Sequence, residues 1–258
     1  MGGNVFQGTS DFDHKHIDAI LNTVNKSLAG TGIEVIPVGS AATPTPGKRS
    51  GDLDVIVDLD AVMQYFDVRD AKQGRKMLND YIAQKGFDTA QSGTNVHVRA
   101  PVGGESHQVD IMVVANAPTV AQFHKHNIPQ GSPYKGMHKQ LAMSKLAKNK
   151  GLLWSAWKGL FRRDDKGKAG EFISSDLDQI AKVLLNDSAT AKDLGSLEAI
   201  LAAMPQEQAD ALMAELEQDR NWTTVKTETL EDKQLERIKA LTGALLNSSV
   251  MVSGAFNQ

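Results

Sequence analysis

Apolar residues near the start of the chain recur every three or four positions, which is the period of one face of an α-helix. This spacing predicts a helix within residues 13–29, whose apolar face consists of Ile17, Ile20, Leu21, Val24 and Leu28. Gly30 and Gly32 follow and end the helix. The β-branched run at 33–38 then predicts a short buried strand.

The pattern next predicts a loop over 41–51, because two prolines and two glycines interrupt it, and a second strand over 53–59. A helix over 69–84 follows. Three strands are expected near 87–91, 95–100 and 106–115, with Gly103 and Gly104 turning the last two into a hairpin. The order α-β-β-α-β-β-β predicts an α+β fold, in which a mixed sheet carries helices on one side.

From residue 134 the pattern is helical again, and this helix ends at Gly151. Residues 154–173 predict a strand, a polar turn and a return strand, with Trp154 and Trp157 supplying core. A helix is expected over 174–185. Residues 188–258 carry acidic amphipathic helices, which should pack as a helical unit on the rest of the chain or on a partner.

The composition is that of an ordinary globular protein, with 41% apolar and 23% charged residues. No apolar run approaches the roughly 18 residues that a membrane span needs. The first residues also lack the basic and apolar regions of an export signal, so we expect a cytoplasmic protein with no membrane partner. The absence of cysteine excludes disulfides and thiolate chemistry, and leaves oxygen or imidazole to hold any metal.

A net charge of −3 conceals a basic stretch in the middle of the chain. Residues 135–168 contain 10 Lys and Arg against two Asp, a net charge of +8, whereas residues 169–258 contain seven against 15, a net charge of −8. A basic stretch suits contact with a phosphate backbone, and the expected contacts are Lys139, Lys145, Lys148, Arg162 and Arg163. The alternative is a solvated Lys-rich helix.

The candidate chemistry is concentrated in three aspartates. Asp52 and Asp54 stand two positions apart in a predicted strand, so their side chains should project from the same face. Asp110 begins the apolar run of another strand, which could lie beside the first. Close carboxylates repel unless a cation separates them, and oxygen ligands favour Mg²⁺ or Mn²⁺, so a site for two such ions is predicted. The alternative is the solvated edge of a half-buried strand.

A phosphate-holding turn is predicted at Gly39 and Ser40, directly after the strand at 33–38. Glycine lets backbone N–H groups approach phosphate oxygens, and the serine adds a hydroxyl. Lys48 and Arg49, in the following loop, could neutralise a triphosphate.

These residues resemble a known family. VGSAATPTPGKRSGDLDVIVD (38–58) and HQVDIMVV (107–114) are similar to the Gly-Ser, Gly-Asp-x-Asp and third-aspartate motifs of the DNA polymerase beta-like nucleotidyltransferase superfamily. Residues 134–167 and 171–185 resemble the thumb of X-family DNA polymerases. The resemblance departs at Gln108 and Met112, where arginine commonly flanks the third aspartate.

The resemblance implies a nucleotidyltransferase palm over 13–125 and a small basic thumb-like segment over 126–187. Residues 188–258 lie outside the resemblance, and their charge and periodicity predict an acidic helical extension. The resemblance implies that Asp52 and Asp54 bind both metal ions, and that Asp110 binds one of them and helps to activate a 3′-hydroxyl. Gly39 and Ser40 would hold the triphosphate, Gly51 would let the chain pass close to it, and the sugar and base would meet Tyr134, Lys135 and Gly136.

The implied reaction transfers a nucleotide from a nucleoside triphosphate to a 3′-hydroxyl, with DNA as the leading acceptor. An alternative keeps the palm but transfers the nucleotide to RNA, tRNA or a protein hydroxyl. A third reading is an inactive nucleic-acid-binding or assembly module.

Overall fold

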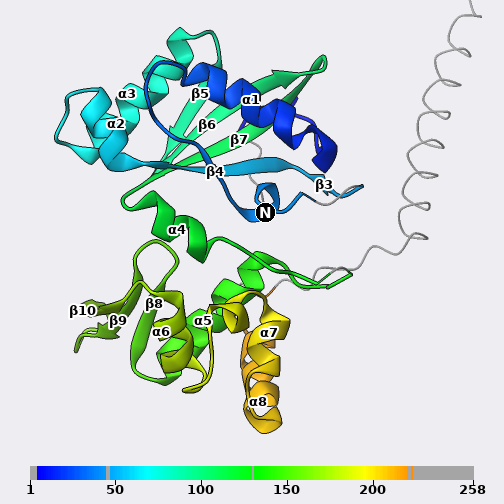
Figure 1. Ribbon diagram of the computed structural model, residues 1–258, viewed down its shortest axis with the longest axis vertical. Helices are drawn as coiled ribbons and strands as arrows, with labels where there is room; N and C mark the ends of the chain where they lie inside the picture. Colours follow the sequence, from blue (N-terminus) through cyan, green and yellow to red (C-terminus); the bar gives the residue numbers. More distant parts are fainter. Residues whose placement is uncertain (1–4, 45–46, 130, 220–221, 223–258) are drawn as a thin grey trace, which may run out of the picture.

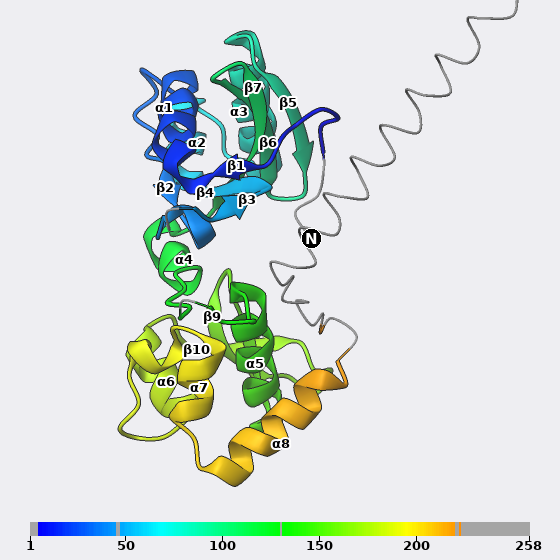
Figure 2. The same ribbon diagram turned by 90° about the vertical axis from the view of Figure 1, so that its right-hand side faces the viewer.

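The computed structural model describes residues 5–44, 47–129, 131–219 and 222, and it has an α+β fold. A sheet with its helices forms one part, and a smaller, mainly helical part begins at the helix α5 (Figures 1 and 2). The segment with α4 connects the two. In the part of the chain that the structure describes, no helix is both long enough and apolar enough to cross a membrane.

A five-stranded mixed sheet forms the centre of the first part, as the sequence predicts. Its strands lie in the order β2-β4-β7-β6-β5, and β4 pairs with β7 in parallel while the other neighbours are antiparallel. Their bounds are β2 Ile36–Pro37, β4 Asp52–Asp58, β5 Asp88–Ser92, β6 Asn95–Val102 and β7 Glu105–Val114. The predicted strand at 33–38 is thus only two residues long.

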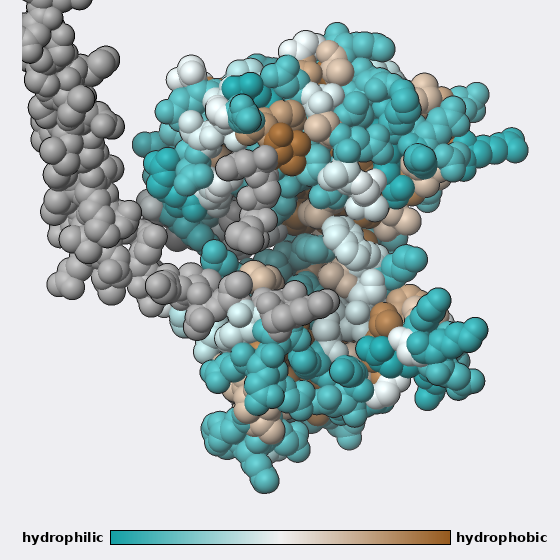
Figure 3. Space-filling view, turned by 180° about the vertical axis from the view of Figure 1, so that it is seen from behind, coloured by the Kyte–Doolittle hydropathy of each residue, from teal (hydrophilic) through white to brown (hydrophobic). Residues whose placement is uncertain are grey.

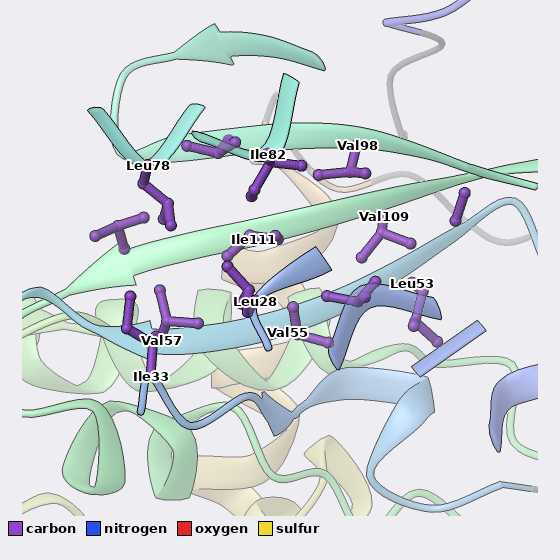
Figure 4. Packing of buried hydrophobic residues seen from close by; sticks show 14 of the residues in the cluster. Leu28, Ile33, Leu53, Val55, Val57, Leu78, Ile82, Val98, Val109 and Ile111 are labelled. Carbon is purple, nitrogen blue, oxygen red and sulfur yellow. The ribbon is translucent and has the colours of Figure 1, made fainter. Parts of the chain in front are cut away.

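The helices α1 (Ile17–Ser27) and α3 (Ala71–Gln84) cover one face of this sheet (Figure 1). Figure 4 shows side chains from β4, β7 and β6 packed against side chains from these helices; examples are Leu53, Val55, Ile111, Leu78 and Ile82. All five are completely buried. A short helix that the apolar pattern does not predict, α2 (Leu59–Tyr65), joins this layer.

The opposite face of the sheet is polar at one end and apolar at the other. At its apolar end Ile56 and Met112 pack against Val120 of α4 (Ala117–Phe123), a second helix that the apolar pattern does not predict. The prediction of helices on one side only is therefore wrong. The helix is short and has proline in its first turn, so its apolar period is too brief to be recognised in the sequence.

Short elements lie in the sequence just before β4, the strand that begins at the polar end of this face. The predicted loop at 41–51 contains the end of a 3₁₀ turn, η2 (Gly39–Ala41), and the strand β3 (Arg49–Ser50). β3 pairs with β1 (Phe12–Asp13), which precedes the 3₁₀ turn η1 (His14–His16).

The second part encloses its own apolar core. It contains α5 (Gly136–Asn149), β8 (Leu152–Ser155), β9 (Gly159–Arg163), β10 (Ala169–Ser174), α6 (Leu177–Leu184), η3 (Ala191–Leu194), α7 (Leu197–Ala202) and α8 (Gln206–Glu217). Three antiparallel strands stand where two were predicted. The turn that divides β8 from β9 was not predicted, and it ends at Gly159. This glycine has a φ of +103°, and a Cβ on it would clash with Ser174 O. Trp154 is buried as predicted, but Trp157 lies in this turn and is exposed.

The helices α7 and α8 belong to the same apolar cluster as α5. Leu197, Ile200, Leu212 and Leu216 are buried in it together with Met143. The packing predicted for the acidic extension is confirmed for these two helices. Residues 223–258 lie outside the described residues.

Candidate active site

The three predicted carboxylates lie on one face of the sheet, on the neighbouring strands β4 and β7. Asp54 stands directly opposite Asp110 in the parallel register, and Asp52 stands opposite Gln108. The three carboxylates are partly buried, whereas Leu53, between the two of β4, is completely buried on the other face. The alternation of the strand thus directs all three carboxylates to one region.

Burial and mutual repulsion oppose the ionisation of these carboxylates. Desolvation, followed by the negative charges of Asp52 and Asp110, raises the pKa of Asp54 to about 7. Burial and the charge of Asp110 also raise the pKa of Asp52. A cation among the three side chains would relieve this repulsion.

The predicted phosphate-holding turn contacts this cluster. Gly39 has a φ of +57°, and a Cβ at this position would stand 3.3 Å from Asp54 Oδ2. Val38 N donates to Asp54 O at 3.1 Å, and Gly39 N donates to His124 O at 3.3 Å. Glycine therefore serves both the left-handed conformation and the close approach to Asp54. The backbone of Ser40 belongs to the same turn.

The other residues predicted for the triphosphate are less closely tied to the cluster. Gly51 precedes Asp52, and a Cβ on it would stand 3.3 Å from Asp11 Oδ1. Asp11 is exposed, and its negative charge adds the smallest contribution to the raised pKa of Asp52, after burial and the charge of Asp110. Lys48 is exposed, and Arg49 Nη2 donates to Asp11 O at 2.8 Å. Triphosphate contacts by Lys48 and Arg49 remain a prediction.

Two side chains hold Asp110 from the interior of the sheet. His97 stands opposite Asp110 on β6, and its Nδ1 lies 2.8 Å from Asp110 Oδ1. Gln108 Nε2 donates to the same oxygen at 2.9 Å. His97 was not among the predicted site residues, although the alternation of Val96, His97 and Val98 places its side chain on the carboxylate face.

The residues predicted to meet the sugar and base lie at the start of α5. The ring of Tyr134 packs edge-on against His138, with centroids 5.6 Å apart, and Lys135 is exposed. A Cβ at Gly136 would clash with the ring of His126, so a larger residue there would force this ring to move. The segment around His124 and His126 therefore touches both the Gly39 turn and the start of α5.

Lys139 does not fit its predicted contact with nucleic acid. It is 2% exposed, and its Nζ donates to Phe123 O at 3.2 Å and to Lys125 O at 2.7 Å. Burial lowers its pKa to about 8. The prediction for Lys139 is wrong because the ammonium group caps carbonyls at the end of α4 inside the protein.

The four other basic side chains differ in how freely they can reach a phosphate. Lys145 pairs with Asp219 at 3.0 Å, and Arg162 pairs with Glu171 at 3.4 Å. Arg163 donates to Leu152 O and to Gly167 O, each at 2.8 Å. Lys148 is exposed. These four remain predicted contacts, with Arg163 largely committed to the backbone.

The donor set suits a hard divalent cation, although its geometry does not form a closed site. Among the described residues, no group of three or more His, Asp or Glu side chains is arranged to hold a metal ion by itself. Mg²⁺ is commonly bound by one or two carboxylates together with substrate phosphates and water. The repulsion among Asp52, Asp54 and Asp110 is consistent with such an incomplete protein site.

No protein-family model matches the sequence. A comparison with characterised proteins finds no sequence match. Among solved structures, the fold is similar to polymerase beta of Leishmania infantum in a ternary P/T complex, at a TM-score of 0.43 and 16% identity, covering 76% of this chain and 74% of that chain.

Proposed function

We propose that this protein is a metal-dependent nucleotidyltransferase that transfers a nucleotide from a nucleoside triphosphate to a 3′-hydroxyl, with DNA as the acceptor. The observation that carries the proposal is the convergence of Asp52, Asp54 and Asp110 on one face of β4 and β7. The turn at Gly39, which the sequence predicts to hold phosphate, lies directly against Asp54.

The three aspartates have different roles in the proposed reaction. Asp52 and Asp54 would hold two Mg²⁺ or Mn²⁺ ions, with Asp110 as a further ligand. When bound, the ions neutralise charge on the phosphates. Asp110 accepts the proton of the attacking hydroxyl, whose oxygen bonds to the α-phosphorus. The bond from that phosphorus to the leaving diphosphate breaks, and diphosphate departs.

Support for nucleic acid as the acceptor comes from lysines at the end of α5 and in the turn between β9 and β10. Arg163 N donates to Gly151 O at 3.2 Å, which brings these two segments together. Both carry exposed lysines: Lys148, Lys150, Lys166 and Lys168. Hydrophilic side chains also cover much of the lower part in Figure 3. Lysines grouped in this way suit a phosphate backbone.

The test is a transfer assay with alternative acceptors. The purified protein is incubated with each labelled ribonucleoside or deoxyribonucleoside triphosphate, Mg²⁺ or Mn²⁺, and primer DNA, tRNA or a protein substrate. We expect labelled DNA from the wild-type protein and none from Asp54→Asn. If only tRNA or only protein is labelled, that molecule and not DNA is the acceptor. Binding without transfer to any acceptor would reject the enzyme in favour of a binding module.

A further inference from the structure

His97 occupies the interior position next to the third carboxylate. It is 5% exposed, and its ring bridges two partners: Nδ1 lies 2.8 Å from Asp110 Oδ1 and Nε2 lies 2.7 Å from Ser92 Oγ. Ser92 ends β5, so the three side chains connect three neighbouring strands of the sheet.

The direction of these hydrogen bonds follows from the chemistry of the partners. An ionised carboxylate only accepts, so His97 Nδ1 carries the proton that binds Asp110. In the tautomer with a proton on Nδ1, Nε2 is an acceptor, to which the Ser92 hydroxyl donates. The carboxylate of Asp110 thereby fixes the tautomer of His97, and the Ser92 hydroxyl, which can donate or accept, matches it.

Gln108 completes the arrangement from the other side. Its Oε1 accepts from Val5 N at 2.9 Å, which leaves its amide nitrogen to donate to Asp110 Oδ1 at 2.9 Å. Both donors therefore engage the same oxygen of Asp110. Within the described residues, no hydrogen bond falls on Asp110 Oδ2, and none from a side chain falls on Asp54.

We infer that His97 is a positioning residue, which holds Asp110 through Oδ1 so that Oδ2 remains available to the reacting groups. This inference rests on the proposed function for its catalytic meaning. Partners that orient a metal-binding carboxylate typically change metal affinity or activity by about 10–100-fold when they are removed.

Two substitutions of His97 separate its two nitrogens. The amide nitrogen of Asn lies near the position of Nδ1, and that of Gln lies near the position of Nε2. We expect His97→Asn to retain transfer within about fivefold of wild type. We expect His97→Gln and His97→Ala to lower kcat about 10–100-fold, with little change in the KM for the triphosphate.

His107 provides the matched control. It is 2% exposed and lies on β7, but its Nδ1 bonds to Ser10 O at 2.9 Å on the other side of the sheet. Its Asn and Gln variants should both lower the melting temperature, and the two variants should have the same kcat. A merely structural His97 would behave like His107, and that result would overturn the inference. Ser92→Ala, which leaves His97 in place, should give a smaller loss of kcat and covers the case in which His97 variants fail to fold.

Two measurements do not depend on turnover. The ¹⁵N chemical shifts of the His97 ring should show a protonated Nδ1, and a protonated Nε2 with bare Nδ1 would overturn the inference. Mn²⁺ binding followed by electron paramagnetic resonance should weaken about 10-fold in His97→Gln and His97→Ala but not in His97→Asn. An active wild type whose His97→Ala variant keeps its rate and Mn²⁺ affinity would reject the role of His97 alone. A wild type with neither transfer nor Mn²⁺ binding would reject the proposed function as well.

Discussion

Asp54 of β4 and Asp110 of β7 are direct neighbours in a parallel register, although more than fifty positions separate them in the sequence. Parallel neighbours present side chains to the same face at the same height, so the register brings two carboxylates together by backbone geometry alone. A slip of one residue in this pair would place Val109 or Ile111 beside Asp54 and send Asp110 to the buried face. Pairing of β4 with β7 is therefore a condition for the site.

The carboxylate pair of β4 should be essential for transfer. Asp52→Asn and Asp54→Asn are each expected to lower the transfer rate more than tenfold, because loss of a metal-clamped transition state costs several kcal/mol. The rate is measured with Mn²⁺ and Mg²⁺ at saturating triphosphate. Asp60→Asn, at an exposed position just after the strand, should keep the wild-type rate. Either site variant retaining more than about a tenth of the activity would contradict the assignment.

Asp54→Asn should stabilise the metal-free protein at alkaline pH. The pKa of Asp54 is raised to about 7 from 3.8, so the folded state binds more protons across this interval and Asp54 progressively lowers stability as the pH rises through it. Without divalent cations, Asp54→Asn should melt above wild type at pH 8, and the gain should be smaller at pH 5. Equal differences at the two pH values would show that burial of Asp54 and repulsion by its neighbours do not oppose folding.

Substitution of Gly39 should affect both the stability of the protein, through its left-handed backbone, and the transfer activity, through its contact with Asp54. Gly93 has nearly the same φ, +56° against +57°, but a Cβ there meets nothing within 4 Å. Alanine at either position should lower stability by about 1–2 kcal/mol through the left-handed backbone. Only Gly39→Ala should also lower kcat/KM, by about tenfold or 1.4 kcal/mol, because its Cβ displaces Asp54. Thermal melts and transfer kinetics of both variants check this. Equal kcat/KM values for the two variants would show that the turn at Gly39 is not part of the active site.

The exposed lysines at the end of α5 and in the β9–β10 turn should set the salt dependence of DNA binding. Replacing Lys148, Lys150, Lys166 and Lys168 by alanine should weaken binding and reduce the slope of log affinity against log salt by about 0.9 for each lysine that neutralises a phosphate. Fluorescence anisotropy over a salt series measures this slope. Lys192→Ala, outside the basic stretch, is the control and should leave it unchanged. An unaltered slope in the fourfold variant would make these lysines only a solvated surface.

The last two described helices should be necessary for the stability of the second part. Leu216 of α8 is completely buried in the cluster that contains α5, whereas Val183 of α6 is 37% exposed. Leu216→Ala should lower the free energy of unfolding by about 2–5 kcal/mol, and Val183→Ala by less than about 1 kcal/mol. A chain ending at Asn186 should melt at a lower temperature for the same reason. Denaturant unfolding measures both, and unchanged stability would make the extension a dispensable tail.

Local periodicity was sufficient to predict most strands and the longer helices of this chain. The alternation around Leu53 predicted that Asp52 and Asp54 share a face, and two adjacent glycines predicted the hairpin between β6 and β7. Such features depend on residues that are close in the sequence, so a single chain displays them directly. The two short helices α2 and α4 were missed, because one or two turns provide too few apolar repeats.

Only the tertiary structure decided which side chains meet. It placed His97 and Gln108 on one oxygen of Asp110, brought Gly39 against Asp54, and buried Lys139 under the carbonyls that follow α4. A lysine in a basic amphipathic stretch has the same local pattern whether its ammonium group faces water or caps a neighbouring helix. The sequence by itself determined the two strands that present the carboxylates. Their partners depended on strand order and helix packing, because hydrogen bonds and charge repulsion act over a few ångströms in space and not over a few positions along the chain.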